Sequence, residues 1–251
     1  MKLEGRVALL TAAAGAGIGQ ATARMIAQEG GTVVITDIHP ERPLSVAEKI
    51  KEDYGVEALG MRCDVTRREE VEETVKTTFD TFGRIDILVN NAGTNRPSQI
   101  VDMSDEDWGM VINTCLSGAF YFCRAVLPVM IKQNFGRIIN IASTAAFMGL
   151  DHGHAHYAAA KAGLMAFTRC LAMEAAPYYI TANTIAPGFI HNEFIPHLYP
   201  ASEIERMNQS IPYPRKGVPE DVANTALFLI SDEGEYITGQ TICVAGGSWM
   251  R

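Results

Sequence analysis

The chain has 251 residues, of which 47% are apolar and 20% charged, and it contains 22 glycines. This composition is typical of a globular protein with a large core, and it excludes a disordered chain, a collagen and a disulfide-rich miniprotein. The formal net charge of −8 and the pI near 5.3 argue against nucleic acid and anionic lipid as partners, because both attract basic surfaces.

The cysteines predict a reducing compartment. The five cysteines are odd in number, widely spaced and without a CxxC pair, which fits neither a disulfide framework nor a zinc ribbon, so we expect free thiols and a cytoplasmic location. Residues 1–6 hold no apolar signal segment, and no uncharged apolar run approaches the ~18 residues of a membrane span. We therefore expect no membrane segment.

Short aliphatic or β-branched runs alternate with longer segments of helical periodicity, which predicts parallel strands joined by crossover helices. The predicted strands are 6–11, 32–36, 58–62, 85–89, 137–141, 180–185 and 240–244. The predicted helices are 18–29, 43–53, 67–82, 104–132, 156–176 and 219–231. The strands are almost entirely apolar, as in sheets covered on both faces. We therefore predict an α/β protein with one doubly wound Rossmann domain over 1–251, in which helices cover both faces of a seven-stranded parallel sheet.

Two helix starts carry capping residues. Ser104, with Asp107 three residues later, resembles a capping box, and Pro219 followed by Glu220 and Asp221 suits a first helical turn. The segment 188–217 is different, because it combines four prolines with several aromatic residues and has no clear period. We expect a long, partly helical excursion here, with a substrate lid at about 189–214.

A glycine turn and then a helix follow the first predicted strand, which is the arrangement in which backbone amides bind a pyrophosphate. Asp37 ends the second strand, where a carboxylate can accept both adenosine-ribose hydroxyls and repel a 2′-phosphate, so it favours NAD over NADP. A strand-end cap is the alternative role for Asp37, and the nearby Arg42 could still bind a phosphate. Asp64 and the Asn90 to Gly93 motif follow the third and fourth strands, at the edge where doubly wound folds bind ligands.

Tyr157 and Lys161 are four residues apart at the start of a predicted helix, so their side chains share one face. An adjacent ammonium would stabilise the phenolate and lower the tyrosine pKa from ~10 toward the working range; a solvated helix face is the alternative. Ser143 ends the fifth strand and would bring a hydroxyl to the same edge. Asn113 is unfavourable in the middle of helix 104–132, which favours a specific role, although a surface position is the simpler alternative.

Together these residues resemble the short-chain dehydrogenase/reductase family from Gly5 to Gly247, and are similar to its 3-oxoacyl-carrier-protein reductase-like members. The shared motifs are Asn90 to Gly93, the Asn113/Ser143/Tyr157/Lys161 tetrad, Pro187-Gly188 and Tyr236 to Gln240. The resemblance implies that Tyr157 is the general acid/base and that Lys161 lowers its pKa and binds the nicotinamide ribose. It also implies that Ser143 binds the substrate oxygen, that Asn113 holds a water of the proton relay, and that the chain forms a homotetramer through helices 104–132 and 156–176.

The resemblance further implies a set of contacts to NAD. They are Gly15, Gly17, Ile18, Gly19, Asp37, Ile38, Asp64, Val65, Asn91, Ala92, Gly93, Tyr157, Lys161, Pro187, Gly188, Ile190 and Asn192.

The chain departs from the family pattern at three places. Ala12 or Ala13 stands where the glycine turn has its first glycine, and because alanine is strained at positive φ, we expect Gly15 to supply that freedom instead. The interval from Ser143 to Tyr157 is one residue longer than usual, which places an insertion in loop 149–156. Asn192 replaces a frequent threonine at the carboxamide contact.

Five of the six histidines, namely His152, His154, His156, His191 and His197, fall near one mouth of the predicted site. No cysteine or carboxylate cluster completes a ligand set, so we predict no metal site. We expect one or two imidazoles to contact a polar substrate, His154 first, and the others to face solvent.

These features predict an NAD-dependent oxidoreductase that transfers hydride between a secondary alcohol, or a hydroxyacyl thioester, and the nicotinamide. Ser143, His154 and Tyr157 are the expected substrate contacts. Alicyclic or aromatic alcohols, sugars and steroids remain open as substrates. The alternatives are a catalytically weak NAD-binding scaffold or sensor subunit, and a lyase or epimerase that uses NAD transiently.

Overall fold

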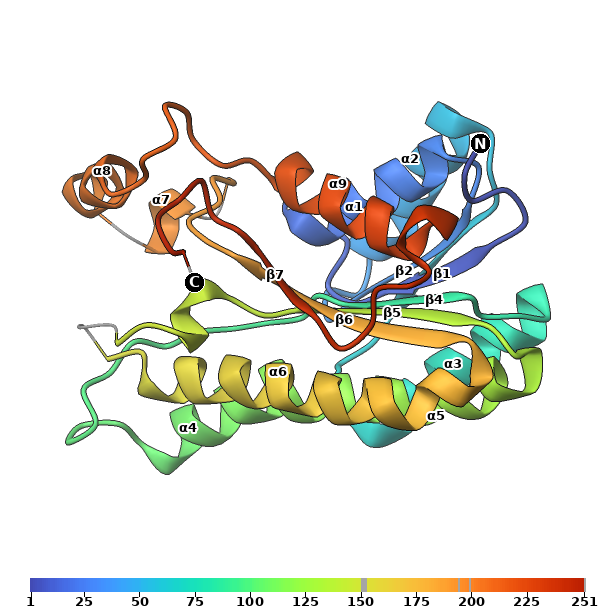
Figure 1. The fold of residues 1–251 in the computed structure, drawn as a ribbon, viewed down its shortest axis with the longest axis horizontal. Helices are drawn as coiled ribbons and strands as arrows, with labels where there is room; N and C mark the ends of the chain where they lie inside the picture. Colours follow the sequence, from blue (N-terminus) through green and yellow to red (C-terminus); the bar gives the residue numbers. More distant parts are fainter. Residues whose placement is uncertain (150–152, 194, 199, 251) are drawn as a thin grey trace.

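The computed structural model describes residues 1–149, 153–193, 195–198 and 200–250. Seven parallel strands form one sheet in the order β3-β2-β1-β4-β5-β6-β7 (Figure 1). Their bounds are β1 (Val7–Leu10), β2 (Thr32–Asp37), β3 (Ala58–Arg62), β4 (Ile87–Asn90), β5 (Gly136–Ile141), β6 (Ile180–Pro187) and β7 (Thr241–Val244). The chain reverses its direction of winding between β1 and β4, so a crevice is expected at the carboxyl ends of these strands.

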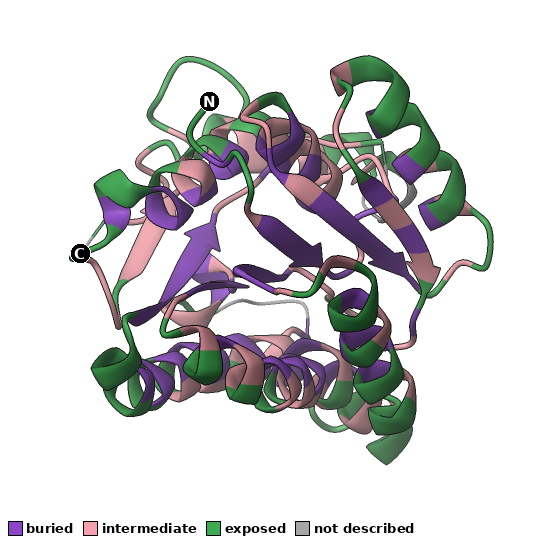
Figure 2. Ribbon diagram, turned by 90° about the vertical axis from the view of Figure 1, so that its right-hand side faces the viewer, coloured by how far each residue is buried: buried purple, intermediate pink, exposed green. Residues whose placement is uncertain are grey.

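Helices cover both faces of the sheet (Figures 1 and 2). One face carries α1 (Ile18–Gln28), α2 (Arg42–Tyr54) and α9 (Pro219–Ile230), and the other carries α3 (Arg68–Phe82), α5 (Gly118–Gln133) and α6 (Ala155–Ala175). The remaining helical segments are α4 (Asp105–Ile112), the π-helical turn η1 (Asn113–Ser117), the 3-10 turns η2 (Thr144–Ala146), η3 (Ala176–Tyr178) and η4 (Asp232–Gly234), and α7 (Ile195–Leu198) and α8 (Ala201–Gln209).

The alternating side chains of the strands fill two hydrophobic clusters, one on each face of the sheet. In β1, Ala8 and Leu10 pack in the cluster under α1 and α9, whereas Val7 and Leu9 pack in the cluster under α5. Side chains of this size each contribute roughly 1.5–3 kcal/mol when they are fully buried. Both faces are covered, so a strand in the middle of the sheet must be apolar throughout.

The predicted fold class and all seven strands are confirmed, with element bounds shifted by a few residues at most. Both predicted helix starts are also confirmed, because Ser104 Oγ accepts from the Asp107 N–H at 3.0 Å and Asp221 Oδ2 accepts from the Val218 N–H at 2.9 Å. The predicted helix 104–132 differs in one respect, since the π-helical turn η1 interrupts it.

The helical stretch Asp105–Gln133 contains an 18-residue window with a mean hydropathy of 1.5, and it is long and apolar enough to cross a membrane by length and composition alone. Phe122, Val126 and Met130 on α5 are fully buried in the cluster under the sheet. Packing against the core therefore accounts for the apolar character of this stretch.

Candidate active site

The turn after β1 leaves the amino end of α1 open. Gly17 is the N-cap, no side chain caps the helix, and its first turn carries no acidic residue. A Cβ on Gly17 would meet no atom within 4 Å. The first N–H groups of a helix lack intrahelical partners and carry partial positive charge. This end of α1 therefore fits a pyrophosphate group.

The Asn90 to Gly93 motif holds this turn in place. The Asn91 amide donates to the carbonyls of Thr11 (3.1 Å) and Ala12 (2.9 Å), and Thr11 Oγ1 accepts from the N–H groups of Asn91 (2.9 Å) and Ala92 (3.0 Å). A Cβ on Gly19 would lie 2.5 Å from Asn91 Nδ2 and 2.8 Å from the Ala12 carbonyl. Only glycine fits at position 19, and the side chain of Asn91 is engaged by the protein itself.

Ala12 adopts a left-handed backbone with φ of 49°. This conformation is costly for a residue with a Cβ. The expectation that Gly15 would supply this freedom in place of alanine is therefore wrong. The two hydrogen bonds from Asn91, one of them to the Ala12 carbonyl, hold the strained residue in place.

Asp37 lies buried at the carboxyl end of β2, as predicted. One of its oxygens accepts from the His39 N–H at 3.0 Å and lies 3.5 Å from an Arg42 nitrogen. The next residue, Ile38, is 60% exposed. The carboxyl end of β2 thus holds the two groups expected from the sequence. The Asp37 carboxylate suits ribose hydroxyls, and the Arg42 guanidinium suits a phosphate.

Asp64 and Val65 follow β3, at the same edge of the sheet. The Asp64 carboxylate accepts from the N–H (2.9 Å) and hydroxyl (2.7 Å) of Thr66, whereas Val65 is buried against Gly118.

Ser143, Tyr157 and Lys161 come together at the carboxyl end of β5. Ser143 follows this strand, and the other two residues lie in the first turns of α6. Ser143 lies close enough to the Tyr157 hydroxyl to favour its charged form. Lys161 is buried, its Nζ donates to the Ile141 carbonyl at 2.7 Å, and it lies 5.6 Å from the centre of the Tyr157 ring. Three of the four residues of the expected tetrad therefore share one site.

Burial raises the pKa of Tyr157 to about 12; the neighbouring Cys115 acts in the same direction, and the hydrogen bond with Ser143 opposes both. Burial also lowers the pKa of Lys161. The expected lowering of the Tyr157 pKa by Lys161 is not found. The reason is that the Lys161 ammonium is directed to the Ile141 carbonyl, while packing around the partly buried phenol disfavours its charged form.

Asn113 does not join this group. It is exposed, and its side-chain oxygen accepts from the Ser117 hydroxyl at 3.3 Å. Residues two apart on a helix point to different faces, and the buried one here is Cys115, which packs with Ala160 and Tyr157. The structure therefore does not support the relay role expected for Asn113. The sequence signal that was missed is a cysteine at the position where the helix faces Tyr157.

The histidines before Tyr157 mainly bind other parts of the protein. His156 is fully buried: its Nδ1 accepts from the Tyr157 N–H, and its Nε2 lies 2.9 Å from the Arg96 carbonyl. The expectation of a solvent-facing side chain is wrong for His156. His154 Nδ1 lies 2.7 Å from the amide nitrogen of Asn95, so the loop after β4 packs on the start of α6. His191 Nε2 lies 2.6 Å from Asn208 Oδ1.

His152 and the side chain of His197 lie outside the described residues. Among the residues that are described, no group of three or more His, Cys, Asp or Glu side chains could hold a metal ion.

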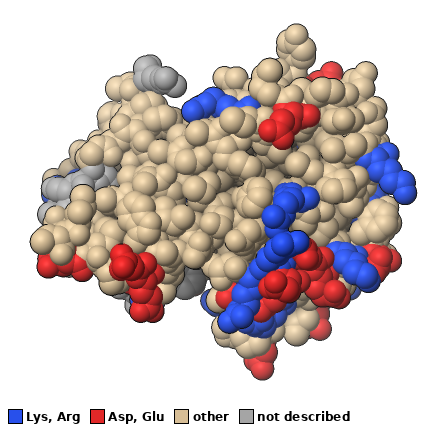
Figure 3. Space-filling view, turned by 90° about the horizontal axis from the view of Figure 1, so that it is seen from below, with Lys and Arg blue, Asp and Glu red and all other residues tan. Residues whose placement is uncertain are grey.

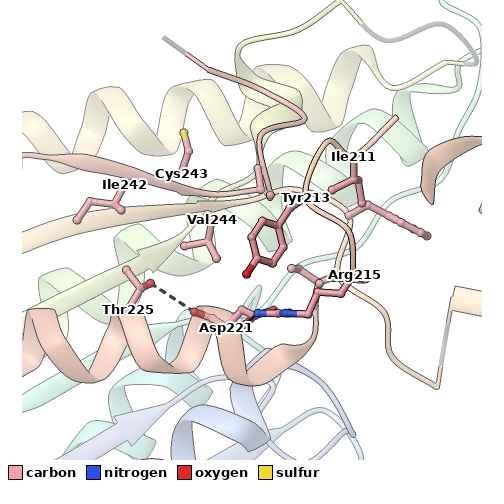
Figure 4. A pocket seen from close by; sticks show the side chains of 13 residues that line it. Ile211, Tyr213, Arg215, Asp221, Thr225, Ile242, Cys243 and Val244 are labelled. Carbon is pink, nitrogen blue, oxygen red and sulfur yellow. Dashed lines mark hydrogen bonds and ion pairs between the residues drawn. The ribbon is translucent and has the colours of Figure 1, made fainter. Parts of the chain in front are cut away.

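The segment after β6 borders a cavity of about 370 Å³ (Figure 4). Ile190, an expected cofactor contact, lines it together with Tyr213, Asp221 of α9 and Val244 of β7. Arg215 binds both Asp221 oxygens at 2.7 Å and closes one side of it. The cavity is separate from Tyr157 and Ser143, which are not among its lining residues.

The expected contacts to the nicotinamide carboxamide lie at the end of β6 and just beyond it. Pro187 is the last residue of β6, Asn192 is partly buried, and a Cβ on Gly188 would lie 2.8 Å from the Cβ of Ala245.

Known proteins match the chain over nearly its full length. A family model described as enoyl-(acyl carrier protein) reductase matches residues 12–248. The chain is 43% identical to a 3-oxoacyl-(acyl-carrier-protein) reductase from Thermotoga maritima over 252 residues, which cover 98% of this chain and 99% of the relative. It is 40% identical over 247 residues to a (2S)-((R)-hydroxy(phenyl)methyl)succinyl-CoA dehydrogenase subunit from Thauera aromatica, with 98% of each chain covered.

Among solved structures, one described as a short-chain alcohol dehydrogenase from Sinorhizobium meliloti superposes with a TM-score of 0.93 at 34% identity, covering 98% of this chain and 97% of the other. The fold agrees with that of this solved structure. The chain belongs to the short-chain dehydrogenase/reductase family of oxidoreductases.

Proposed function

We propose that the protein reduces a ketone to a secondary alcohol, or catalyses the reverse reaction, with a nicotinamide cofactor and with Tyr157 as the acid/base. The observation that carries this proposal is the meeting of Ser143, Tyr157 and Lys161 at the carboxyl end of β5, where Lys161 Nζ lies 5.6 Å from the centre of the Tyr157 ring. A bound nicotinamide would supply or accept the hydride. The residues that we propose to hold the cofactor are those expected from the sequence, among which the open end of α1 and Asp37 are the best supported.

The protonation state of Tyr157 favours the reduction direction. With a pKa of about 12, the phenol stays protonated at neutral pH and can donate its proton to the oxygen that becomes negative as a ketone is reduced. The Ser143 hydroxyl, which lies near Tyr157, can donate to the same oxygen. An ammonium has three donors; Ile141 takes one from Lys161, which leaves donors for ribose hydroxyls.

For the substrate we propose an acyl thioester with a keto group, reduced in the cytoplasm. The Thermotoga maritima and Thauera aromatica relatives are named for acyl groups on a carrier protein or on coenzyme A. Segment 189–214 is the proposed lid, since Phe189, Ile211 and Tyr213 give the adjoining cavity an apolar and aromatic wall. The five cysteines are free thiols, which supports a reducing compartment.

The acid/base role predicts the effect of Tyr157→Phe, which removes only the hydroxyl. Reduction of acetoacetyl-CoA, followed through NADH absorbance, should fall roughly 10²- to 10⁴-fold. NADH binding, followed by fluorescence, should persist. Tyr54→Phe on α2 is the matched control and should keep full activity. Retained activity in Tyr157→Phe would show that another residue is the acid/base. Wild-type protein that binds NADH but reduces no ketone would favour an NAD-binding role without turnover.

For the cofactor we propose NAD, because the buried Asp37 carboxylate would repel a 2′-phosphate. The double variant Asp37→Ala/Ile38→Arg removes this charge and adds a cation at a position that is 60% exposed. The ratio of kcat/KM for NADPH to kcat/KM for NADH should rise about tenfold or more. An unchanged ratio would contradict the role of Asp37. If the wild-type protein prefers NADPH and Arg42→Ala loses this preference, then Arg42 binds the 2′-phosphate of the adenosine ribose and decides the choice of cofactor.

We also propose that the chain forms a homotetramer through the surface of α5 and α6. Seen from this side, charged side chains gather at one edge and most of the surface is uncharged (Figure 3). Exposed apolar side chains on these helices and the turn after them include Phe120, Met173 and Tyr179, with exposed fractions of 39%, 80% and 72%. Exposed apolar side chains on a largely uncharged surface favour association.

Light scattering should give about four times the chain mass of 27.3 kDa. Met173→Glu, which places a charge on this surface without disturbing the core, should yield smaller species, whereas Lys51→Glu on the opposite helical layer should not. A monomeric wild-type protein would contradict the proposal.

A further inference from the structure

Cys115 occupies an unusual stretch of backbone. It is the middle residue of the π-helical turn η1, which joins α4 and α5. Such turns are rare and occur frequently at functional sites. The wider turn leaves Asn113 exposed and Cys115 buried, with 1% of its surface accessible. The thiol therefore points toward the protein interior, where α6 begins.

The Cys115 thiol bonds to both backbone groups of one residue. Its sulfur accepts from the Thr94 N–H and donates to the Thr94 carbonyl, each at 3.4 Å. Thr94 directly follows the Asn90 to Gly93 motif, in a segment without regular secondary structure. A backbone N–H and carbonyl in a partly buried loop need partners, and here a single side chain supplies both.

The same segment borders the catalytic lysine. A Cβ on Gly93 would lie 3.4 Å from Lys161 Nζ and 3.7 Å from Cys115 Sγ, so both side chains end close to Gly93. Tyr157 packs in the same small cluster as Cys115. Lys161 Nζ donates to the Ile141 carbonyl, and the Gly93 backbone borders its ammonium on another side.

We propose that Cys115 is a positioning residue, which fixes the Gly93–Thr94 backbone beside Lys161 through its two hydrogen bonds to Thr94. This inference rests on the proposed function, in which Lys161 and Tyr157 act together. Cys115 itself does not exchange a proton with substrate in this scheme.

The test compares Cys115→Ala, which removes both bonds, with Cys115→Ser, which keeps a donor and an acceptor. Hydrogen exchange at the Thr94 amide should become about tenfold faster in Cys115→Ala and stay close to wild type in Cys115→Ser. In ketone reduction, kcat should fall about tenfold in Cys115→Ala with KM for NADH within about twofold of wild type, and Cys115→Ser should recover most of the loss.

Cys123→Ala is the matched control. Cys123 is an equally buried thiol that accepts from the Asn90 amide at 3.3 Å, but it lies in the cluster under α5. The control should change neither Thr94 exchange nor kcat by more than about twofold.

Unchanged Thr94 exchange in Cys115→Ala would overturn the proposal, as would an equal loss of kcat in Cys123→Ala. Exchange at Thr94 is measured without substrate, so it separates failure of this inference from failure of the proposed function.

Discussion

The site depends on a partly buried phenol and a buried ammonium that lie side by side. Ser143 lies near the Tyr157 hydroxyl, and Lys161 donates to the Ile141 carbonyl. Both partners belong to the carboxyl end of β5, a strand fixed in register between β4 and β6. The apolar packing of the central sheet therefore fixes the two partner positions, and with them the placement of Tyr157 and Lys161. Burial also sets their protonation, because it disfavours the charged form of each group.

The cofactor end is organised by a different interaction, the Asn91 side chain on the carbonyls of the glycine turn. The same amide leaves no room for a Cβ at Gly19, which lies in the first turn of α1. Asn91 therefore both holds the strained Ala12 and lies in close contact with α1. Asn91 thus joins two motifs about 80 residues apart through hydrogen bonds within the protein itself. The turn is preorganised, which reduces the ordering cost of binding.

The sequence predicts the fold well because each buried strand must be apolar throughout and each crossover helix has its own period. Tyr157 and Lys161 can be found from their helical spacing, and Ser143 from its place at a strand end. The π-helical turn could not be predicted, because apolar periodicity continues across 104–132; this is why Asn113 was chosen and Cys115 was missed. The burial of His156 and the high pKa of Tyr157 depend on neighbours from loop 95–98 and from β5, which no local spacing reveals.

The account rests on Tyr157 being protonated at neutral pH, and a spectroscopic titration tests this directly. Tyrosinate formation in the wild-type protein is compared with that in Tyr157→Phe, and the difference belongs to Tyr157. The account predicts no such difference through the neutral range and an ionisation only as the pH approaches the pKa of about 12. A difference that develops with a midpoint near neutral pH would contradict it, and would show that a neighbouring charge outweighs burial at this site.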